Sequence, residues 1–312
     1  MKGKSSVLIT GGSGLVGRYL TSALLSEGFS VSHLSRGKEQ FGKVRVFRWD
    51  PEKGILDPKA FEGIDTIIHL AGANIGEKRW TDSRKEQIRA SRVDSAKLIH
   101  KVLSETGFRI STFISASGIS CYGTVTSEKI FDENDPPAND FLGNLCSEWE
   151  HAADQFASSG ARTVKIRTAV ALERNDSALE KIILPAKFGF LGMVGNGRQY
   201  MPWIHVRDLT RIYVKAVTDQ SMVGVYNAVS PQHMTHREFM KTLSEVLGKP
   251  LLPVPVPAVA LKAAYGEMAG IVLLGSRVSA EKIKNAGFTF EFGDLLSALK
   301  DIFTPKSPRG DF

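Results

Sequence analysis

A short apolar run and a glycine-rich turn stand near the start of the sequence: Val7-Leu8-Ile9-Thr10-Gly11-Gly12-Ser13-Gly14-Leu15-Val16-Gly17. The apolar run predicts a strand, and the apolar spacing that begins at Leu15 predicts a helix directly after the turn. Glycines at 11, 14 and 17 allow a tight turn, a close approach of the backbone to a pyrophosphate and close packing of helix on strand. A tight turn without a ligand is the alternative.

The start of the predicted helix is a natural site for phosphate, because its free N–H groups and its dipole both favour an anion. A strand before the turn and a helix after it are the context that a dinucleotide-binding site requires. The residues predicted to bind the cofactor here are Gly11, Ser13, Gly14, Leu15, Val16 and Gly17.

The next predicted strand covers residues 29–34, and Ser35 and Arg36 follow directly at its end. Many NAD-binding proteins carry an acidic residue at this place, where it accepts hydrogen bonds from the ribose hydroxyls. Ser35 and Arg36 offer a hydroxyl and a planar cation instead, and this pair suits a 2′-phosphate. The sequence therefore favours NADP(H) over NAD; a solvated loop arginine is the alternative.

Strands and helices alternate over the first half of the chain. Further strands are predicted at 44–47, 64–70, 111–115 and 163–166, and helices at 81–103 and 148–157. This order predicts an α/β fold with a doubly wound parallel sheet of the Rossmann type. We expect an NADP-binding domain over 1–174, a returning strand near 222–228, a smaller, mainly helical substrate-side domain over 175–304, and a tail at 305–312.

Composition sets the class of protein. The chain has 312 residues with a net charge of +7, and no block of five like charges, so we expect no nucleic-acid partner. Two cysteines make neither a disulfide framework nor a cysteine-rich metal site. The sequence has no run of 18 apolar residues and no signal-peptide core, so we expect a cytoplasmic protein that does not enter a membrane.

Several motifs resemble the extended, sugar-nucleotide-epimerase-like branch of the short-chain dehydrogenase/reductase superfamily. Within it, the chain is similar to an atypical subgroup called "epimerase family protein", sometimes labelled a cell-division inhibitor. The stretches that carry the resemblance are His69-Leu-Ala-Gly-Ala-Asn74, Arg79-Trp80, Ser91-Arg92, Glu148-Trp149-Glu150, Gly195-Asn-Gly-Arg-Gln199, Trp203-Ile-His-Val206 and Asn285-Ala-Gly-Phe288. The resemblance implies that Leu70, Ala71 and Gly72 lie beside the cofactor and that Arg92 reaches it.

The resemblance also implies acid–base catalysis by a tyrosine with a lysine four residues later, but no tyrosine of this chain has that neighbour. With Glu150 aligned to the superfamily's helix glutamate, Leu142 stands at the tyrosine position and Cys146 at the lysine position. A leucine transfers no proton, and a thiol is no fixed positive charge. Ordinary epimerase chemistry is therefore the least supported function.

Other residues remain as candidates for the chemistry. Ser117 at a strand end and the nearby Tyr122 are the predicted catalytic residues; a local capping hydroxyl and a packed tyrosine are the alternatives. Predicted substrate contacts are Asn74, Arg198, Gln199 and Trp203, with the arginine on a phosphate or carboxylate and the tryptophan as a flat apolar wall. For Arg198 and Gln199 the resemblance implies this role; a solvated arginine and core aromatic residues are the alternative. We expect no metal site, since the histidines are scattered.

Two functions follow from these observations. The first is an NADP(H)-dependent oxidoreductase that acts on a small anionic substrate without the usual tyrosine and lysine. The second is a catalytically silent NADPH-binding sensor or scaffold, which the missing pair favours. Because members of the superfamily often pair through helices, a homodimer is also expected.

Overall fold

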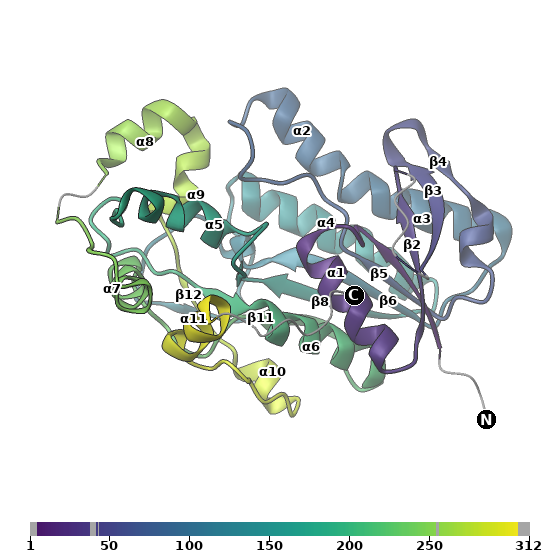
Figure 1. Ribbon diagram of the computed structural model, residues 1–312. Coiled ribbons are helices and arrows are strands. Elements are labelled where there is room, and N and C mark those ends of the chain that lie inside the picture. Colours follow the sequence, from purple (N-terminus) through teal and green to yellow (C-terminus); the bar gives the residue numbers. More distant parts are fainter. Residues whose placement is uncertain (1–4, 38–41, 43, 254–255, 305–312) are drawn as a thin grey trace.

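The computed structural model describes residues 5–37, 42, 44–253 and 256–304. An eight-stranded sheet lies at its centre (Figure 1). From one edge to the other, its strands are β11 (Gly224–Ala228), β8 (Arg162–Thr168), β6 (Thr112–Gly118), β5 (Thr66–His69), β1 (Ser6–Thr10), β2 (Ser30–Ser35), β3 (Arg45–Asp50) and β4 (Ile55–Leu56).

The sheet is parallel except for β4, which runs antiparallel to β3. From β1 the chain moves to β2 and β3 on one side, then crosses to β5, β6 and β8 on the other. The reversal between β1 and β5 is the switch point of a doubly wound sheet, where ligands bind outside the carboxyl ends of the strands. The α/β Rossmann fold predicted from the sequence is confirmed.

Helices cover both faces of the sheet. Helices α1 (Leu15–Ser26) and α6 (Val206–Thr218) pack together on one face, and α3 (Val93–Thr106) and α4 (Phe141–Ser158) pack on the other (Figure 1). Strand β1 contributes side chains to the core on both faces of the sheet, because Val7 and Ile9 belong to one buried apolar cluster and Leu8 belongs to the other. Alternation along a strand buried on both sides explains its continuous apolar run.

The remaining elements gather mainly around a third apolar cluster beyond the carboxyl end of the sheet. They comprise β9 (Val170–Leu172), β10 (Trp203–His205), α5 (Ala178–Ile183), α7 (His236–Leu247), α8 (Ala258–Tyr265), α9 (Gly270–Leu273), α10 (Glu281–Asn285), α11 (Leu295–Phe303) and the paired strands β7 (Ile130–Phe131) and β12 (Arg277–Val278). Short 3₁₀ turns lie at Pro51–Lys53, Pro58–Phe61, Ile119–Tyr122, Leu184–Phe188 and Gly266–Ala269. Strand β11 returns from this region to the sheet, within the range 222–228.

Two helices differ from the predicted ranges. The single helix predicted over 81–103 is wrong: α2 (Asp82–Ala90) ends before α3 begins. The apolar period runs through the break, but the Ser91 hydroxyl accepts a hydrogen bond from the N–H of Ala73, and Arg92 leaves regular helix geometry. Helix α4 begins at Phe141, seven residues before the predicted start, because Asp140 caps it. The predicted tail, 305–312, lies outside the described residues.

Candidate cofactor crevice and substrate cavity

The turn between β1 and α1 requires its glycines. Gly11 has φ +70°, and a Cβ atom on it would lie 3.0 Å from the backbone of Ala71. A Cβ atom on Gly17 would lie 2.4 Å from the carbonyl oxygen of Gly11. Such distances are shorter than real Cβ contacts, so the turn lies directly against the end of β5 and only glycine fits at these positions.

The N-terminus of α1 is open. Gly14 is its N-cap residue and makes no side-chain cap, whereas Thr81, Asp140 and Thr235 cap α2, α4 and α7. The first N–H groups of α1 therefore have no capping side chain and can bind an anion. Arg18 lies beside this end, where its guanidinium donates to the Ser13 carbonyl at 2.8 Å.

A buried hydrogen-bond network holds the end of β5 in place. The Thr10 hydroxyl oxygen accepts from the N–H groups of Leu70 and Ala71, each at 3.1 Å, and bonds to Nδ1 of His69 at 2.8 Å. Burial lowers the pKa of His69 to about 4, so its ring is neutral at pH 7. Its Nε2 lies 3.2 Å from the carbonyl oxygen of Arg92. The network fixes residues 70–72 against the glycine turn.

The end of β2 presents Ser35 and Arg36 beside this crevice. The Ser35 hydroxyl accepts from the N–H of Gly37 at 3.2 Å. Arg36 is exposed, and within the described ranges no carboxylate pairs with it. An exposed guanidinium at this strand end has the chemistry of a phosphate-binding group.

Arg92 supplies a second cation, on the other side of β1. Its guanidinium lies beside Gly72: a Cβ atom there would meet Cζ at 2.8 Å. Nη1 donates to the carbonyls of Ala73 and Ile88 at 3.0 and 3.1 Å, and the group lies over the Trp149 ring. Among the residues that the structure describes, no carboxylate pairs with Arg92. Burial lowers its pKa to about 10.

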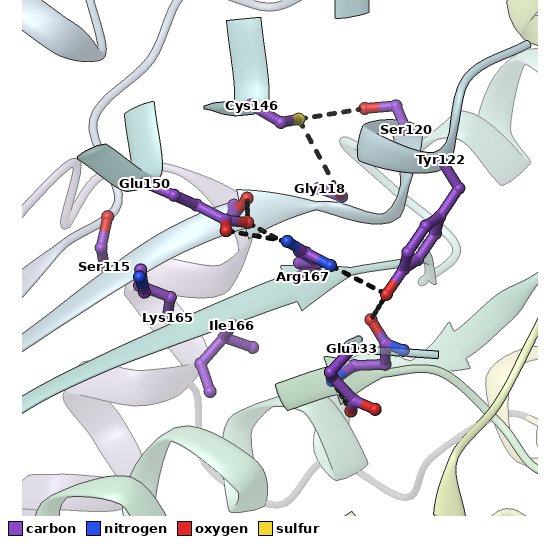
Figure 2. A network of polar contacts seen from close by, with 12 residues as sticks. Ser115, Gly118, Ser120, Tyr122, Glu133, Cys146, Glu150, Lys165, Ile166 and Arg167 are labelled. Atoms are coloured by element: carbon purple, nitrogen blue, oxygen red, sulfur yellow. Dashed lines mark hydrogen bonds and ion pairs between the residues drawn. The ribbon is translucent and has the colours of Figure 1, made fainter. Parts of the chain in front are cut away.

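The two predicted catalytic hydroxyls belong to a buried polar network (Figure 2). Ser117 donates to Glu150 at 2.7 Å, and Tyr122 donates to the Asn227 amide oxygen at 2.9 Å. Arg167 joins them: its Nε and Nη2 donate to Glu150 at 2.7 and 2.9 Å, and its Nη1 donates to the Tyr122 hydroxyl at 3.0 Å. Burial raises the pKa of Tyr122. Catalysis by Ser117 and Tyr122 stays a prediction, and these contacts favour a structural role.

Helix α4 carries Leu142 and Cys146 at the positions of the missing pair. Both are buried, with 2% of each residue exposed. The thiol of Cys146 lies 3.6 Å from the carbonyl oxygen of Gly118 and 3.6 Å from the Ser120 hydroxyl. Burial raises its pKa, so the thiol is protonated and neutral at pH 7.

The four predicted substrate residues differ in their exposure to solvent. Trp203 is fully buried in the third apolar cluster, so its ring forms no wall of a cleft, and that prediction is corrected. Gln199 is also buried, and its amide donates to the carbonyls of Val194 and Val272. Arg198 and Asn74 are exposed; the Asn74 side chain accepts from the N–H of Gly76. Substrate contact by these two stays a prediction.

A sizeable cavity lies elsewhere, between the start of α4 and the segment from α8 to α9. It holds about 540 Å³ and is lined by Trp80, Phe141 and Leu142 on one side and by Lys262 and Leu274 on the other. Sequence reasoning missed Phe141, Lys262 and Leu274. The available signal was Asp140, a cap residue that places Phe141 and Leu142 in the first turn of a helix.

Within the described ranges, no helix is long and apolar enough to cross a membrane. The same residues contain no group of three or more His, Cys, Asp or Glu side chains placed to hold a metal ion.

The chain is similar to proteins of known family along nearly its whole length. "Epimerase family protein ML0860" of Mycobacterium leprae is 32% identical over 305 residues, covering 97% of each chain. "Epimerase family protein SDR39U1" of Mus musculus is 33% identical over 300 residues, covering 95% of this chain and 99% of that protein. A crystal structure of human epimerase family protein SDR39U1 with NADPH matches with a TM-score of 0.83 at 30% identity, covering 95% of this chain and 98% of that chain.

Two family models match separate parts of the chain. A domain of unknown function matches residues 256–302, the segment that contains α8 to α11. The other model matches residues 7–228, from β1 to the last residue of β11. The fold, the glycine turn and these matches agree, and the chain belongs to the NAD dependent epimerase/dehydratase family.

Proposed function

We propose that this chain binds NADP(H) across the carboxyl ends of β2, β1 and β5 and transfers hydride between the nicotinamide and a small anionic substrate. The observation that carries the proposal is the uncapped N-terminus of α1 beside the turn from Gly11 to Gly17. An open helix start next to a backbone without side chains suits a pyrophosphate.

The charges on either side of the turn support a phosphorylated dinucleotide. Arg36 would hold the 2′-phosphate over β2, because it is a free planar cation with no carboxylate competing among the described residues. Arg92 would hold oxygens of the nicotinamide half over β5, where the absence of a side chain on Gly72 lets the guanidinium lie against the backbone. The human SDR39U1 structure with NADPH supports the same choice of cofactor. When bound, the nicotinamide ring supplies the hydride chemistry.

One specific observation favours a second function, a catalytically silent NADPH-binding sensor or scaffold. Leu142 and the neutral Cys146 replace the usual acid–base pair, while Ser117 and Tyr122 direct their hydroxyl hydrogens into the buried network. No proton donor of the usual kind then faces the cavity from α4. Under both functions we propose a cytoplasmic protein, homodimeric, whose ligands are small molecules rather than nucleic acid or membrane.

Fluorescence titration with NADPH and NADH tests the cofactor. Arg36→Ala should weaken NADPH binding by about tenfold or more, since a charge-assisted hydrogen bond to phosphate is lost, and should leave NADH binding unchanged. Arg36→Lys should lose less NADPH affinity than Arg36→Ala, because lysine keeps the positive charge. Arg109→Ala removes an exposed arginine that precedes β6, at the amino ends of the strands and away from the crevice. This variant should bind both nucleotides as the wild type does. Equal affinity of the wild type for both nucleotides would overturn the choice of NADP(H).

Single-turnover oxidation of bound NADPH then separates the two functions. Substrate-dependent loss of nicotinamide absorbance supports the oxidoreductase. Tight NADPH binding without oxidation across a panel of carbonyl acids supports the silent sensor or scaffold.

A further inference from the structure

The cavity between α4 and the α8–α9 segment has a size that suits a ligand. Its volume of about 540 Å³ falls within the range of roughly 300–1,000 Å³ typical of small-molecule sites. Contacts join its two sides: Lys85 of α2 pairs with Glu267 at 2.5 Å, and Arg79 donates to the carbonyl of Ala263 at 3.5 Å. Figure 1 shows α8 and α2 facing each other across this region.

The wall of the cavity toward α2 and α4 is apolar and aromatic. The rings of Trp80 and Phe141 meet edge to face, with centroids 4.9 Å apart. The indole N–H of Trp80 is already bonded to the carbonyl of Ile75 at 2.9 Å, so that ring has no donor left for a ligand. Leu142 continues the wall. This surface suits hydrocarbon and offers little to sugar hydroxyl groups.

Among the charged side chains that line the cavity, Lys262 is the one without a hydrogen-bond or ion-pair partner in the described residues. Asp140 accepts from the N–H groups of Gly143 and Thr124 and from the Thr124 hydroxyl, so its carboxylate is occupied by the cap of α4. Glu267 pairs with Lys85. Lys262 has no carboxylate partner in the part of the chain that the structure describes. An apolar wall beside an exposed ammonium that has no partner among the described residues suits an apolar ligand that carries a carboxylate.

The cavity lies close to the end of β6, with one turn of α4 between them. Leu142 stands one helical turn before Cys146, whose thiol contacts the carbonyl of Gly118 at the end of β6. A ligand against Leu142 therefore lies next to the carboxyl ends of the central strands, where a doubly wound sheet places its reactive ligands.

We propose that this cavity binds a compact, predominantly apolar monocarboxylate, with Lys262 at the carboxylate and Trp80 and Phe141 at the hydrocarbon part. This inference deepens the proposed function by naming its substrate class, and it rests on that function for the ligand's role as substrate. A nucleoside diphosphate sugar suits the cavity poorly, because its pyrophosphate and hydroxyl groups would face one ammonium and an apolar wall.

Calorimetric titration with 4-phenylbutyrate and its uncharged amide tests the proposal. The wild type should bind the acid about tenfold or more tightly than the amide, the difference expected from one charge-assisted contact. Lys262→Gln should bind both probes equally, and Lys262→Arg should restore the preference. Lys241→Gln, on α7, is the matched control and should behave as the wild type.

Gly270→Leu tests the location. A Cβ atom on Gly270 has only ordinary contacts of 3.5 Å or more with Thr124, so the variant should fold, and its side chain would project into the cavity and narrow it. It should bind neither probe while its thermal unfolding midpoint stays near that of the wild type. Unchanged binding in this variant would overturn the location.

The remaining outcomes separate this inference from the proposed function. Equal wild-type affinity for acid and amide, no acid binding at millimolar concentration, or displacement of the acid by UDP-glucose at lower concentration would each overturn it. NADPH affinity is measured on the same samples. Acid binding without NADPH binding would overturn the proposed function and leave the ligand class standing. NADPH binding without acid binding would overturn the ligand class and leave the proposed cofactor standing.

Discussion

The buried pair between Glu150 and Arg167 should be one of the most sensitive points of the fold, and Glu150→Gln tests this directly. Arg167 reaches Glu150 through two guanidinium donors, at 2.7 and 2.9 Å, and Ser117 adds a third bond at 2.7 Å. The side chains of Arg167 and Glu150 are 7% and 10% exposed. Glutamine keeps the size of the side chain but leaves the guanidinium buried without its counter-charge (Figure 2).

The expected loss follows from that geometry. Removing one partner of a buried ion pair destabilises a protein by about 3–5 kcal/mol, because the other charge stays desolvated. The pair joins α4 to β8, and Arg167 also donates to Tyr122, so the loss applies to the packing of α4 on the sheet. Asp154→Asn is the control on the same helix. Its pair with Lys165 involves an aspartate that is 49% exposed, and its loss should be within about 1 kcal/mol.

Urea unfolding of the two variants and the wild type measures the difference. A double variant, Glu150→Leu with Arg167→Met, should lose less stability than Glu150→Gln, since it leaves no buried charge unpaired. If Glu150→Gln loses no more stability than Asp154→Asn, the pair is hydrated in solution and the reasoning from burial fails.

Two other perturbations test the glycine turn and the β5 edge. Gly17→Ala puts a Cβ atom 2.4 Å from the Gly11 carbonyl oxygen, so it should destabilise by about 1–3 kcal/mol in urea and abolish NADPH binding; Gly192→Ala, with open space around it, should change neither. The pKa of His69 is about 4 when folded against an ordinary 6.5, so the unfolded chain binds the extra proton and stability falls as pH drops from 6.5 to 4, by about 3 kcal/mol from this residue. His69→Asn should reduce that slope by this residue's share, since burial also lowers the pKa of His33, His205 and His236 to about 4. An unchanged slope would show that His69 titrates normally in the folded protein.

The parts of the fold that depend on local sequence were predictable. The strand, the glycine spacing and the helix that follow one another from Val7 to Leu24 predict the central β1–α1 unit, and the structure has it. The break between α2 and α3 was not predictable from periodicity, since apolar residues keep helical spacing across it. It arises from contacts of Ser91 and Arg92 with Ala73, which lies 18 residues before Ser91 in the segment between β5 and α2.

The site was predictable where its residues lie close together in sequence and not where their partners are distant. Ser117 was placed correctly at a strand end, but its partner Glu150 is 33 residues away on α4. Trp203 follows a glycine-rich loop, a pattern that fits a cleft wall as well as a core residue. Its burial depends on packing with Phe239 of α7 and Leu299 of α11, which no local pattern reveals.

The unusual residues on α4 and α3 are physically linked. Arg92 is the N-cap residue of α3, and its guanidinium lies over the ring of Trp149 on α4, three residues after Cys146. Burial is the main cause of the shifted pKa of both Arg92 and Cys146, and an electrostatic interaction between the two groups contributes less. A lysine at position 146 would place an ammonium group close to a buried guanidinium that has no described carboxylate partner, and two like charges in a site of low dielectric repel strongly. A small neutral thiol avoids that repulsion. The cation at the end of β5 therefore explains the absence of a lysine on α4. The positive charge beside the crevice comes from Arg92, the N-cap residue of α3. The facing turn of α4 can then form the apolar wall that begins at Leu142.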